Sequence, residues 1–378
     1  MKQAEYQGKW HALHNSDCIE GMHSMADQGI AVDCMVTSIP FGDLFVYSDS
    51  ERDLGNAGEG GKFLEQYKYF AEALTRVMKP GRVACIHVTD LPTRKGKHGF
   101  IGLQDFSGDI IRAHEAAGMI YHSRVTIWKD PVVEMQRTKA LGLLYKQIRK
   151  DSTMNRIGMP DYMLMFRAKG ENPDRVEHCA PNMETEVHEV TGHHCEDCGA
   201  DHDFSVKFCP DCGNQIVTYK RTERRGKASK ETVDIAKKWL AEMHRQGLAS
   251  ETPSDDVLAE LIKHAEFDVY EWQKLASPVW MDINQGKVLN GWRGAKAEND
   301  ERHVCPLQLD VIERCLRLYS KPGDVVLDPF NGIGSTGYQA IKMFRRYLGF
   351  ELKPEYAALA GRNLAEAEAS AGGLFDAA

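Results

Sequence analysis

The chain has 378 residues, enough for one large domain or two ordinary ones. Its net charge of -8 excludes attraction to nucleic acid by global charge, so any such contact needs a local basic surface. No apolar run approaches the roughly 18 residues of a membrane span, and the polar N-terminus predicts no signal peptide, which together favour a cytoplasmic protein.

The first elements place polar residues after buried strands. Residues 9–17 predict a short strand that ends at Asp17, and residues 18–28 have helical spacing. Asp17 therefore stands where open α/β sheets bind ligands, although Asn15, Ser16 or Asp17 could equally be the helix cap, and the two roles can coexist. The next buried strand, residues 31–37, leads directly into Ser38-Ile39-Pro40-Phe41, with Cys34 expected in the core.

Alternating strands and helices follow. Residues 42–61 lack periodicity and predict a loop beside Ser38, and residues 62–78 predict a helix whose aromatic residues belong to the core. Further strands are expected at 83–88, 122–129 and 161–167, with a helix at 109–117. This order predicts a mainly parallel sheet with helices on both faces.

The middle of the chain differs in composition. Residues 172–190 are polar and acidic and predict a linker. Two C-x-x-C pairs then appear, each followed by glycine, and their spacing predicts a closed structural zinc site in which His193 and His194 take no part. The four predicted ligands are Cys195, Cys198, Cys209 and Cys212.

A basic run follows the cysteine pairs, at residues 219–230. It predicts phosphate contacts, and a solvated linker is the alternative. Its candidate DNA-binding residues are Lys220, Arg221, Arg224, Arg225 and Lys227. Amphipathic helices are predicted over 232–247 and 254–275, the second capped by Ser254.

A glycine-rich turn near the C-terminal end predicts a cofactor site. Val325-Val326-Leu327 reads as a buried strand, and Gly332, Gly334 and Gly337 form G-x-G-x-x-G before a helix. Glu351 ends a second strand, where a carboxylate can accept hydrogen bonds from ribose hydroxyls. A nucleoside cofactor is implied, although a tight strand-helix turn without ligand gives the same pattern. Only residues 352–378 follow, so further strands must come from upstream, which disfavours a nicotinamide-dependent oxidoreductase.

Two of these motifs resemble those of the S-adenosylmethionine-dependent DNA amino-methyltransferases of beta-type, permuted order. Asp328-Pro-Phe-Asn-Gly-Ile-Gly-Ser-Thr336 is similar to their cofactor motif, with Ser335 in place of Thr. Thr37-Ser-Ile-Pro-Phe41 is similar to their catalytic motif, with Ile39 in place of Pro. The resemblance implies a catalytic group of Ser38, Ile39, Pro40 and Phe41 and a cofactor site of Asp17, His303, Asp328, Pro329, Phe330, Asn331, Gly332, Gly334, Ser335, Thr336 and Glu351.

The resemblance also implies a reaction. The Ser38 side chain and the Ile39 carbonyl can accept the hydrogens of a base amine, which frees its lone pair for a methyl sulfonium, while Phe41 stacks on a flipped base. Ser at position 38 is often associated with cytosine N4 in that family, yet a wider loop at Ile39 would suit the larger ring, so adenine N6 is slightly favoured over cytosine N4.

The predicted architecture is an α/β, Rossmann-like methyltransferase sheet with an antiparallel edge strand and an inserted zinc-ribbon and helical module. Its parts are a catalytic half (1–170), a target-recognition insert (171–300) and a cofactor-binding half (301–378). Double-stranded DNA is the expected partner, a restriction-modification role fits, and a homodimer stays open. The alternatives are a methyltransferase of RNA or another amine, and a catalytically dead zinc-ribbon DNA-binding protein.

Overall fold

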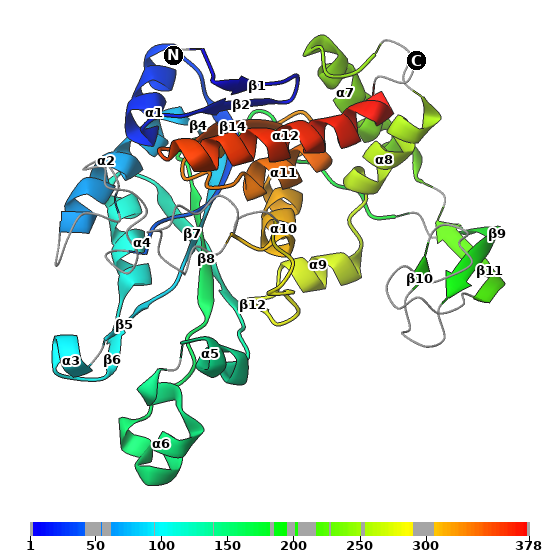
Figure 1. Cartoon of the computed structure of the whole chain (residues 1–378). Helices are drawn as coiled ribbons and strands as arrows, with labels where there is room; N and C mark the ends of the chain where they lie inside the picture. Colours follow the sequence, from blue (N-terminus) through cyan, green and yellow to red (C-terminus); the bar gives the residue numbers. More distant parts are fainter. Residues whose placement is uncertain are drawn as a thin grey trace.

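A single nine-stranded sheet runs through the computed structural model (Figure 1). The structure describes residues 3–41, 54, 62–93, 95–138, 140–181, 185–194, 201–202, 217–226, 228–250, 254–289 and 306–375. In spatial order the strands are β1 (Tyr6–Gln7), β2 (His11–His14), β14 (Arg346–Phe350), β13 (Val325–Asp328), β3 (Val32–Ser38), β4 (Met78–Val88), β8 (Asp161–Arg167), β7 (Ile120–Ile127) and β12 (Val279–Trp280).

The sheet is mainly parallel, as the sequence predicts. Strands β2, β14, β13, β3 and β4 are all parallel, so two strands from the C-terminal end of the chain lie between strands from its N-terminal end. The edge strand β1 is antiparallel to β2. Strand β8 is also antiparallel, but it lies inside the sheet, because β7 and then β12 pair beyond it. The antiparallel edge strand that the sequence predicts is therefore β1, and residues 161–167 form an antiparallel strand inside the sheet.

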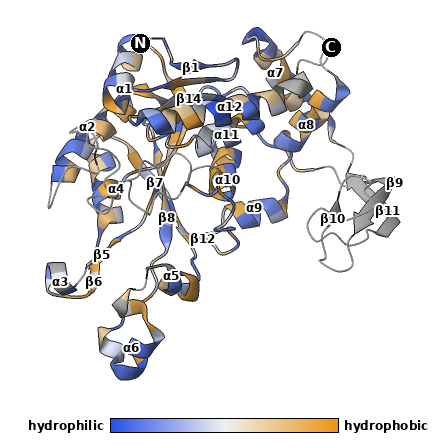
Figure 2. Cartoon of the chain, viewed as in Figure 1, coloured by the Kyte–Doolittle hydropathy of each residue, from blue (hydrophilic) through white to orange (hydrophobic). Residues whose placement is uncertain are grey.

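Helices cover both faces of the sheet. One face packs against α1 (Cys18–Asp27), α2 (Lys62–Val77) and α4 (Phe106–Ala116), and the other against α10 (Leu309–Tyr319), α11 (Ser335–Lys342) and α12 (Pro354–Phe375). Figure 2 shows the apolar residues gathered on the strands and on the inward sides of these helices. No helix in the described part of the chain is long and apolar enough to cross a membrane.

Successive side chains of a strand point to opposite faces of the sheet, and in β3 both sets include buried apolar residues, so helices must cover both faces. In β3, Cys34 and Val36 belong to the apolar cluster under α10, whereas Met35 belongs to the cluster under α2. All three are fully buried, and burial raises the pKa of the Cys34 thiol, so Cys34 is the core residue that its position predicts. A strand that is apolar on both faces is typical of a parallel sheet covered by helices.

The remaining elements lie outside the two main layers. They include a small sheet of β9 (Thr185–His194), β10 (Asp201–His202) and β11 (Val217–Gly226) and a hairpin of β5 (Leu91–Thr93) and β6 (Gly102–Gln104). The helices among them are α3 (Lys95–His98), α5 (Pro131–Thr138), α6 (Tyr145–Lys150), α7 (Lys230–Arg245), α8 (Asp255–Ala265) and α9 (Val269–Leu275), with short 3-10 helices at Leu141–Leu143 and Ser152–Met154. Apolar residues of α7 and α8, such as Met243 and Leu261, join the cluster of α10. Residues 185–190, predicted as linker, form part of β9.

The predicted helix over 254–275 is interrupted in the structure. Helix α8 ends before Glu266, whose backbone is extended and forms a parallel β-bridge with Cys179. Helix α9 then begins with its own cap, because the Asp268 side chain accepts a hydrogen bond from the Glu271 N–H at 2.6 Å. Ser254 stands at the N-cap of α8 without a side-chain capping bond. A backbone pairing distant in sequence therefore breaks a helix that local spacing predicts as continuous.

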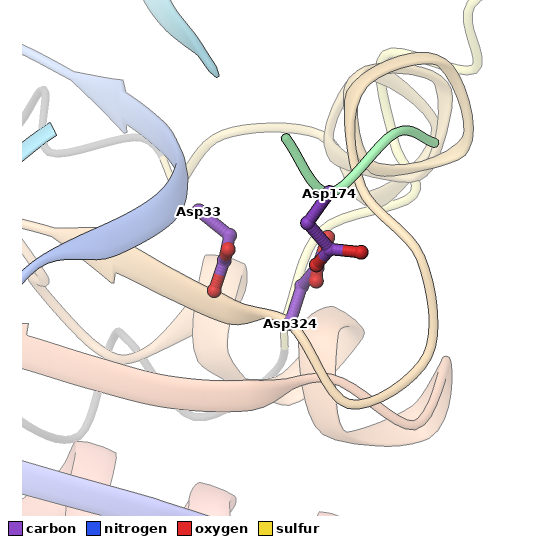
Figure 3. A group of neighbouring side chains, drawn as sticks. All are labelled: Asp33, Asp174 and Asp324. Carbon is purple, nitrogen blue, oxygen red and sulfur yellow. The ribbon is translucent and has the colours of Figure 1, made fainter. Parts of the chain in front are cut away.

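An ion network joins the two halves of the sheet at the end opposite the carboxyl ends of the parallel strands. Asp33 in β3, Asp324 before β13 and Asp174 after β8 bring carboxylate oxygens within 4.8 Å of one another (Figure 3). Buried Arg82 pairs with all three, at 3.0 Å to Asp324 and 3.2 Å to each of the others. Lys79 and Lys321 supply two more cations. Three cationic side chains thus neutralise the three carboxylates and fasten β3 to β13.

Candidate active site

The predicted catalytic and cofactor motifs meet at one edge of the sheet. Because β14, β13, β3 and β4 are parallel, their carboxyl ends lie side by side, and Glu351, Asp328, Ser38 and His87 stand at or directly after those ends. β8 is antiparallel, so its first residue, Asp161, reaches the same edge. Segments nearly 300 residues apart in sequence are therefore neighbours, because β3 pairs directly with β13.

The glycine turn after β13 is open on one side and packed on the other. Gly332 and Gly334 have φ of 53° and 89°, and Gly334 is the N-cap of α11. A Cβ on Gly332 would meet no atom within 4 Å, whereas one on Gly334 would come within 3.2 Å of Ala360 in α12. The open side of the turn is therefore at Gly332. A bulky residue there would enter free space, and one at Gly334 would strain the packing of α12.

Two acidic side chains follow the carboxyl ends of the neighbouring parallel strands β14 and β2. The Glu351 carboxylate accepts hydrogen bonds from the Gly332 N–H at 2.6 Å and the Lys353 N–H at 2.9 Å, so its position is fixed by backbone donors. Asp17 caps α1, as one of the sequence alternatives holds, and its Oδ1 accepts hydrogen bonds from the Ile19 and Glu20 N–H groups at 2.8 and 3.0 Å. Capping uses only Oδ1 of the Asp17 carboxylate, so the other carboxylate oxygen can accept a hydrogen bond from a ligand.

Other polar residues of the turn hold the backbone. The Asn331 side chain donates to the Gly332 carbonyl at 2.8 Å and accepts from the Tyr347 hydroxyl at 2.6 Å. Thr336, in the first turn of α11, donates to the Val36 carbonyl of β3 at 3.2 Å. Phe330 packs at 5.0 Å between ring centroids against Phe70 of α2. Ser335 is buried beside Thr336, and Pro329 lies between Asp328 and Phe330. These side chains therefore hold the shape of the turn and do not point into open space.

A short hydrogen bond connects the two motifs. Thr37, directly before Ser38, donates to the Asp328 carboxylate at 2.6 Å, and the Phe330 N–H donates to the same oxygen at 3.1 Å. Burial raises the pKa of Asp328 to about 6, and the hydrogen bonds from Thr37 and Thr336 oppose that rise. Asp328 thus links the end of the predicted catalytic strand to the glycine turn.

Ser38 is part of a chain of polar side chains. Its hydroxyl lies 2.9 Å from Nδ1 of His87, and Nε2 of His87 lies 3.2 Å from the Asp161 carboxylate, an ion-pair distance without hydrogen-bond geometry. Lys129 pairs with the other Asp161 oxygen at 2.5 Å. Burial alone would raise the pKa of Asp161, but the neighbouring Lys129 and His87 hold it well below its usual value. Asp161 is therefore a fixed negative charge behind the imidazole.

The rest of the predicted catalytic motif divides between core and site. Ile39 is 2% exposed and packs in the cluster of α1 and α2, so its side chain does not widen the space beside Ser38. Pro40 is buried as well. The half-buried Phe41 ring lies 5.8 Å from the His87 ring, at an angle of 58°. Phe41 and Ser38 therefore both border His87.

Several predicted site residues lie outside this edge or outside the described residues. His303, Lys227 and the four cysteines Cys195, Cys198, Cys209 and Cys212 are not among the residues that the structure describes. Lys220, Arg221, Arg224 and Arg225 lie in β11, which pairs with β9 along ten residues. His87 and Asp161 are the site residues that the sequence did not predict. Both stand at the ends of predicted strands, but only the strand order shows that these ends meet.

Comparison with known proteins identifies the family. A profile of the family described as DNA methylase matches residues 32–362, which is most of the chain. The match includes both Ser38 and the turn from Asp328 to Glu351, which the structure brings to one edge. The chain therefore belongs to the DNA methylase family.

Individual relatives match shorter stretches. The type II methyltransferase M.XycI of Xanthomonas campestris pv. cyanopsidis is 33% identical over 99 residues, or 25% of this chain and 31% of that protein. The DNA adenine methyltransferase YhdJ of Escherichia coli (strain K12) is 33% identical over 95 residues, or 25% of this chain and 30% of that protein. The alignments span less than a third of either relative.

A solved structure shares the fold. The DNA modification methylase TTHA0409 of Thermus thermophilus, complexed with S-adenosyl-L-methionine, has a TM-score of 0.50 and 19% identity, covering 94% of each chain. At this identity the likeness concerns the fold alone, and it agrees with the predicted Rossmann-like sheet.

Proposed function

We propose that this protein transfers a methyl group from S-adenosylmethionine to an exocyclic amine of a DNA base, with adenine N6 as the target. The observation that carries the proposal is the direct contact between the two motifs. Thr37, beside Ser38, donates at 2.6 Å to Asp328, which begins the glycine turn. A cofactor held by that turn would lie next to Ser38, as a transfer between two bound molecules requires.

The residues of the turn fit such a cofactor. Gly332 opens onto free space, and the carboxylate of Glu351 is held beside it by two backbone N–H groups. A carboxylate so fixed still has lone pairs that accept hydrogen bonds from ribose hydroxyls. The second oxygen of Asp17 is a candidate acceptor for the adenine amino group. When bound, S-adenosylmethionine supplies an electrophilic methyl group on its sulfonium.

Ser38 and the Ile39 carbonyl prepare the amine. The lone pair of an exocyclic amine is delocalised into the ring, and two acceptors that take its hydrogens draw the nitrogen toward tetrahedral geometry. The Ser38 hydroxyl can donate its own hydrogen to Nδ1 of His87, at 2.9 Å, which leaves its oxygen free to accept from the amine. Phe41 offers the face on which a flipped base stacks.

His87 receives the proton that the reaction releases, and the Asp161 carboxylate stabilises the imidazolium that forms. Once the amine nitrogen carries the new methyl group it holds a surplus proton, which passes to the Ser38 oxygen as the Ser38 hydrogen moves to Nδ1 of His87. The imidazolium then faces the Asp161 carboxylate at 3.2 Å, which stabilises its charge. Lys129 keeps Asp161 in place and ionised.

The choice of base rests on one relative. YhdJ, named a DNA adenine methyltransferase, is 33% identical over 95 residues, and this supports adenine N6. The hydroxyl at Ser38, often found with cytosine N4 in the resembled motif, favours cytosine N4 as the alternative. The buried side chain of Ile39 gives no support to a wider pocket, so the size of the ring does not decide between the two.

The middle of the chain is the proposed target-recognition part. We place a structural zinc ion on Cys195, Cys198, Cys209 and Cys212, because two C-x-x-C pairs at this spacing are typical of zinc ribbons. The basic run in β11, from Lys220 to Arg225, supplies candidate phosphate contacts. Residues 171–300 remain the proposed extent of this part.

Replacement of Ser38 by alanine tests the proposal. We expect Ser38→Ala to lose far more turnover than affinity for DNA or cofactor, because its hydrogen bond matters most while the amine reacts. Turnover is measured with labelled cofactor and duplex DNA, and both affinities by calorimetry. A Ser38→Ala protein with the wild-type turnover would remove Ser38 from the mechanism. Label transferred to RNA and not to DNA would favour the RNA alternative.

A further inference from the structure

Two projecting segments leave the sheet at the edge that carries Ser38. The first, here called the β5–β6 arm, comprises residues 91–104 and begins three residues after β4 ends. The second, the β7–β8 arm, comprises residues 128–160 and joins the end of β7 to Asp161 at the start of β8. Figure 1 shows α3 of the first arm and α5 and α6 of the second extending away from the sheet on the same side.

The two arms are tied together and internally braced. Thr89, at the root of the first, donates to the Pro160 carbonyl at the root of the second, at 3.0 Å. Farther out, a Cβ on Gly142 would come within 3.0 Å of the Ile101 side chain, so the arms touch there too. Within the second arm, buried Glu134 accepts a hydrogen bond from the Met159 N–H at 2.9 Å. The two arms therefore form one braced surface beside the proposed catalytic residues.

The arms are basic in an acidic protein. Residues 91–104 contain three Lys or Arg and no Asp or Glu, and residues 128–160 contain seven Lys or Arg against three Asp or Glu, a net charge of +4. Some of these cations serve the arm itself, as Lys129 pairs with Asp161 and Arg156 with Glu134. In contrast, Lys146, Arg149 and Lys150 of α6 are exposed and have no ion-pair partner among the described residues.

Apolar side chains accompany these cations. Tyr145 at the start of α6 is 69% exposed, Ile157 is 89% exposed, and Phe100 on the other arm is 58% exposed. Exposed cations among exposed aromatic and aliphatic residues match a duplex, because its phosphates attract the cations and apolar side chains can pack on its sugars or insert between its base steps. Figure 2 shows the hydrophilic residues of α6 beside apolar ones.

We infer that the two arms form a duplex-DNA-binding surface, in which Lys146, Arg149 and Lys150 contact the phosphates that flank the target base. This deepens the proposed function and rests on it, and it lies outside the predicted target-recognition insert, residues 171–300. The whole chain carries -8, so a duplex can approach Ser38 only over a locally basic surface, and the arms supply one at the site's own edge.

The test is the triple variant Lys146→Gln, Arg149→Gln and Lys150→Gln. The matched control is Lys68→Gln, Lys342→Gln and Arg362→Gln, which removes three exposed cations from α2, α11 and α12, the helices on the sheet faces. Affinity for a labelled mixed-sequence duplex is measured over a range of salt concentrations. Each phosphate contact contributes about 0.9 to the slope of log affinity against log salt, so the arm variant should lose about 3 from that slope.

Turnover separates binding from chemistry. We expect the arm variant to raise KM for duplex DNA at least about tenfold with kcat unchanged, because phosphate contacts position the duplex and do not touch the amine. Unchanged affinity for S-adenosylmethionine shows that both triple variants are folded. If the arm variant keeps the slope and KM of the control, the inference is overturned. If the wild-type protein binds the cofactor but neither binds nor methylates DNA, both the proposed function and this inference are wrong.

Discussion

Removal of the His87 imidazole is the sharpest perturbation of the proposed chemistry. His87 is 7% exposed, and its Nδ1 lies 2.9 Å from the Ser38 hydroxyl, so His87→Ala deletes the group that receives the Ser38 hydrogen. A positioned proton acceptor typically contributes about 10²–10⁴ to the rate, which corresponds to about 3–5 kcal/mol of transition-state stabilisation. We therefore expect kcat to fall by that factor, with affinity for cofactor and DNA within about threefold of wild type.

Imidazole rescue distinguishes a chemical role from a structural one. The His87→Ala cavity borders Phe41 and Ser38, so added imidazole should enter it and restore part of kcat in a concentration-dependent way. His114 provides the matched control, because it is also a buried histidine, lies 2.9 Å from the Tyr67 hydroxyl and stacks at 4.3 Å on Phe166. His114→Ala should lower the free energy of unfolding but leave kcat per cofactor-binding molecule unchanged and insensitive to imidazole.

The refuting result is a His87→Ala protein that retains kcat within about threefold of wild type, since the proton acceptor would then have no measurable share in the rate. A loss of kcat that imidazole does not restore, matched by an equal loss in His114→Ala, would assign His87 to packing alone.

Three further predictions concern the cofactor turn and the metal. Glu351→Ala should weaken S-adenosylmethionine binding by about 1–3 kcal/mol, because the ribose hydroxyls lose their acceptor, and unchanged calorimetric affinity would contradict this. The folded-state pKa of Asp328, about 6, lies above its ordinary value of 3.8, so the folded protein holds the proton more tightly. The free energy of unfolding of wild type, relative to that of Asp328→Asn, should therefore fall by about 3 kcal/mol as the pH rises from about 4 to about 6, and should stay constant above that. Urea unfolding at a series of pH values measures this difference, and a difference independent of pH would refute the prediction. Elemental analysis should find one zinc per chain, and Cys209→Ser should impair DNA binding while leaving cofactor affinity unchanged. Protein that is purified without chelator and contains no zinc would contradict the proposed zinc site.

Local sequence signals predicted the elements of the core well. The strand 161–167 has the predicted bounds, and the predicted helix over 62–78 differs from α2 by one residue, because apolar spacing reflects burial on one or both faces. The predicted helix 254–275 failed at Glu266, where a bridge to Cys179 overrides the local pattern. The position of β8 inside the sheet could not be predicted either, since it depends on β7 and β12 pairing beyond it.

The two motifs of the candidate site were visible in the sequence because each is a short contiguous pattern. Their partners were not. His87 and Asp161 lie 74 positions apart on strands of opposite direction, and only the pairing of β4 with β8 brings them together at 3.2 Å. The reason for the glycine at position 334 also needed the structure, because its Cβ direction points to Ala360 and not to open space.

Methylation of mixed-sequence duplex DNA with labelled S-adenosylmethionine, followed by digestion and nucleoside mass spectrometry, tests the central claim most directly. We expect label in N6-methyladenine, at a rate that Ser38→Ala abolishes. Label in N4-methylcytosine alone would correct the base and keep the mechanism. Protein that binds the cofactor but leaves DNA without label would contradict the claim that this chain is a DNA amino-methyltransferase.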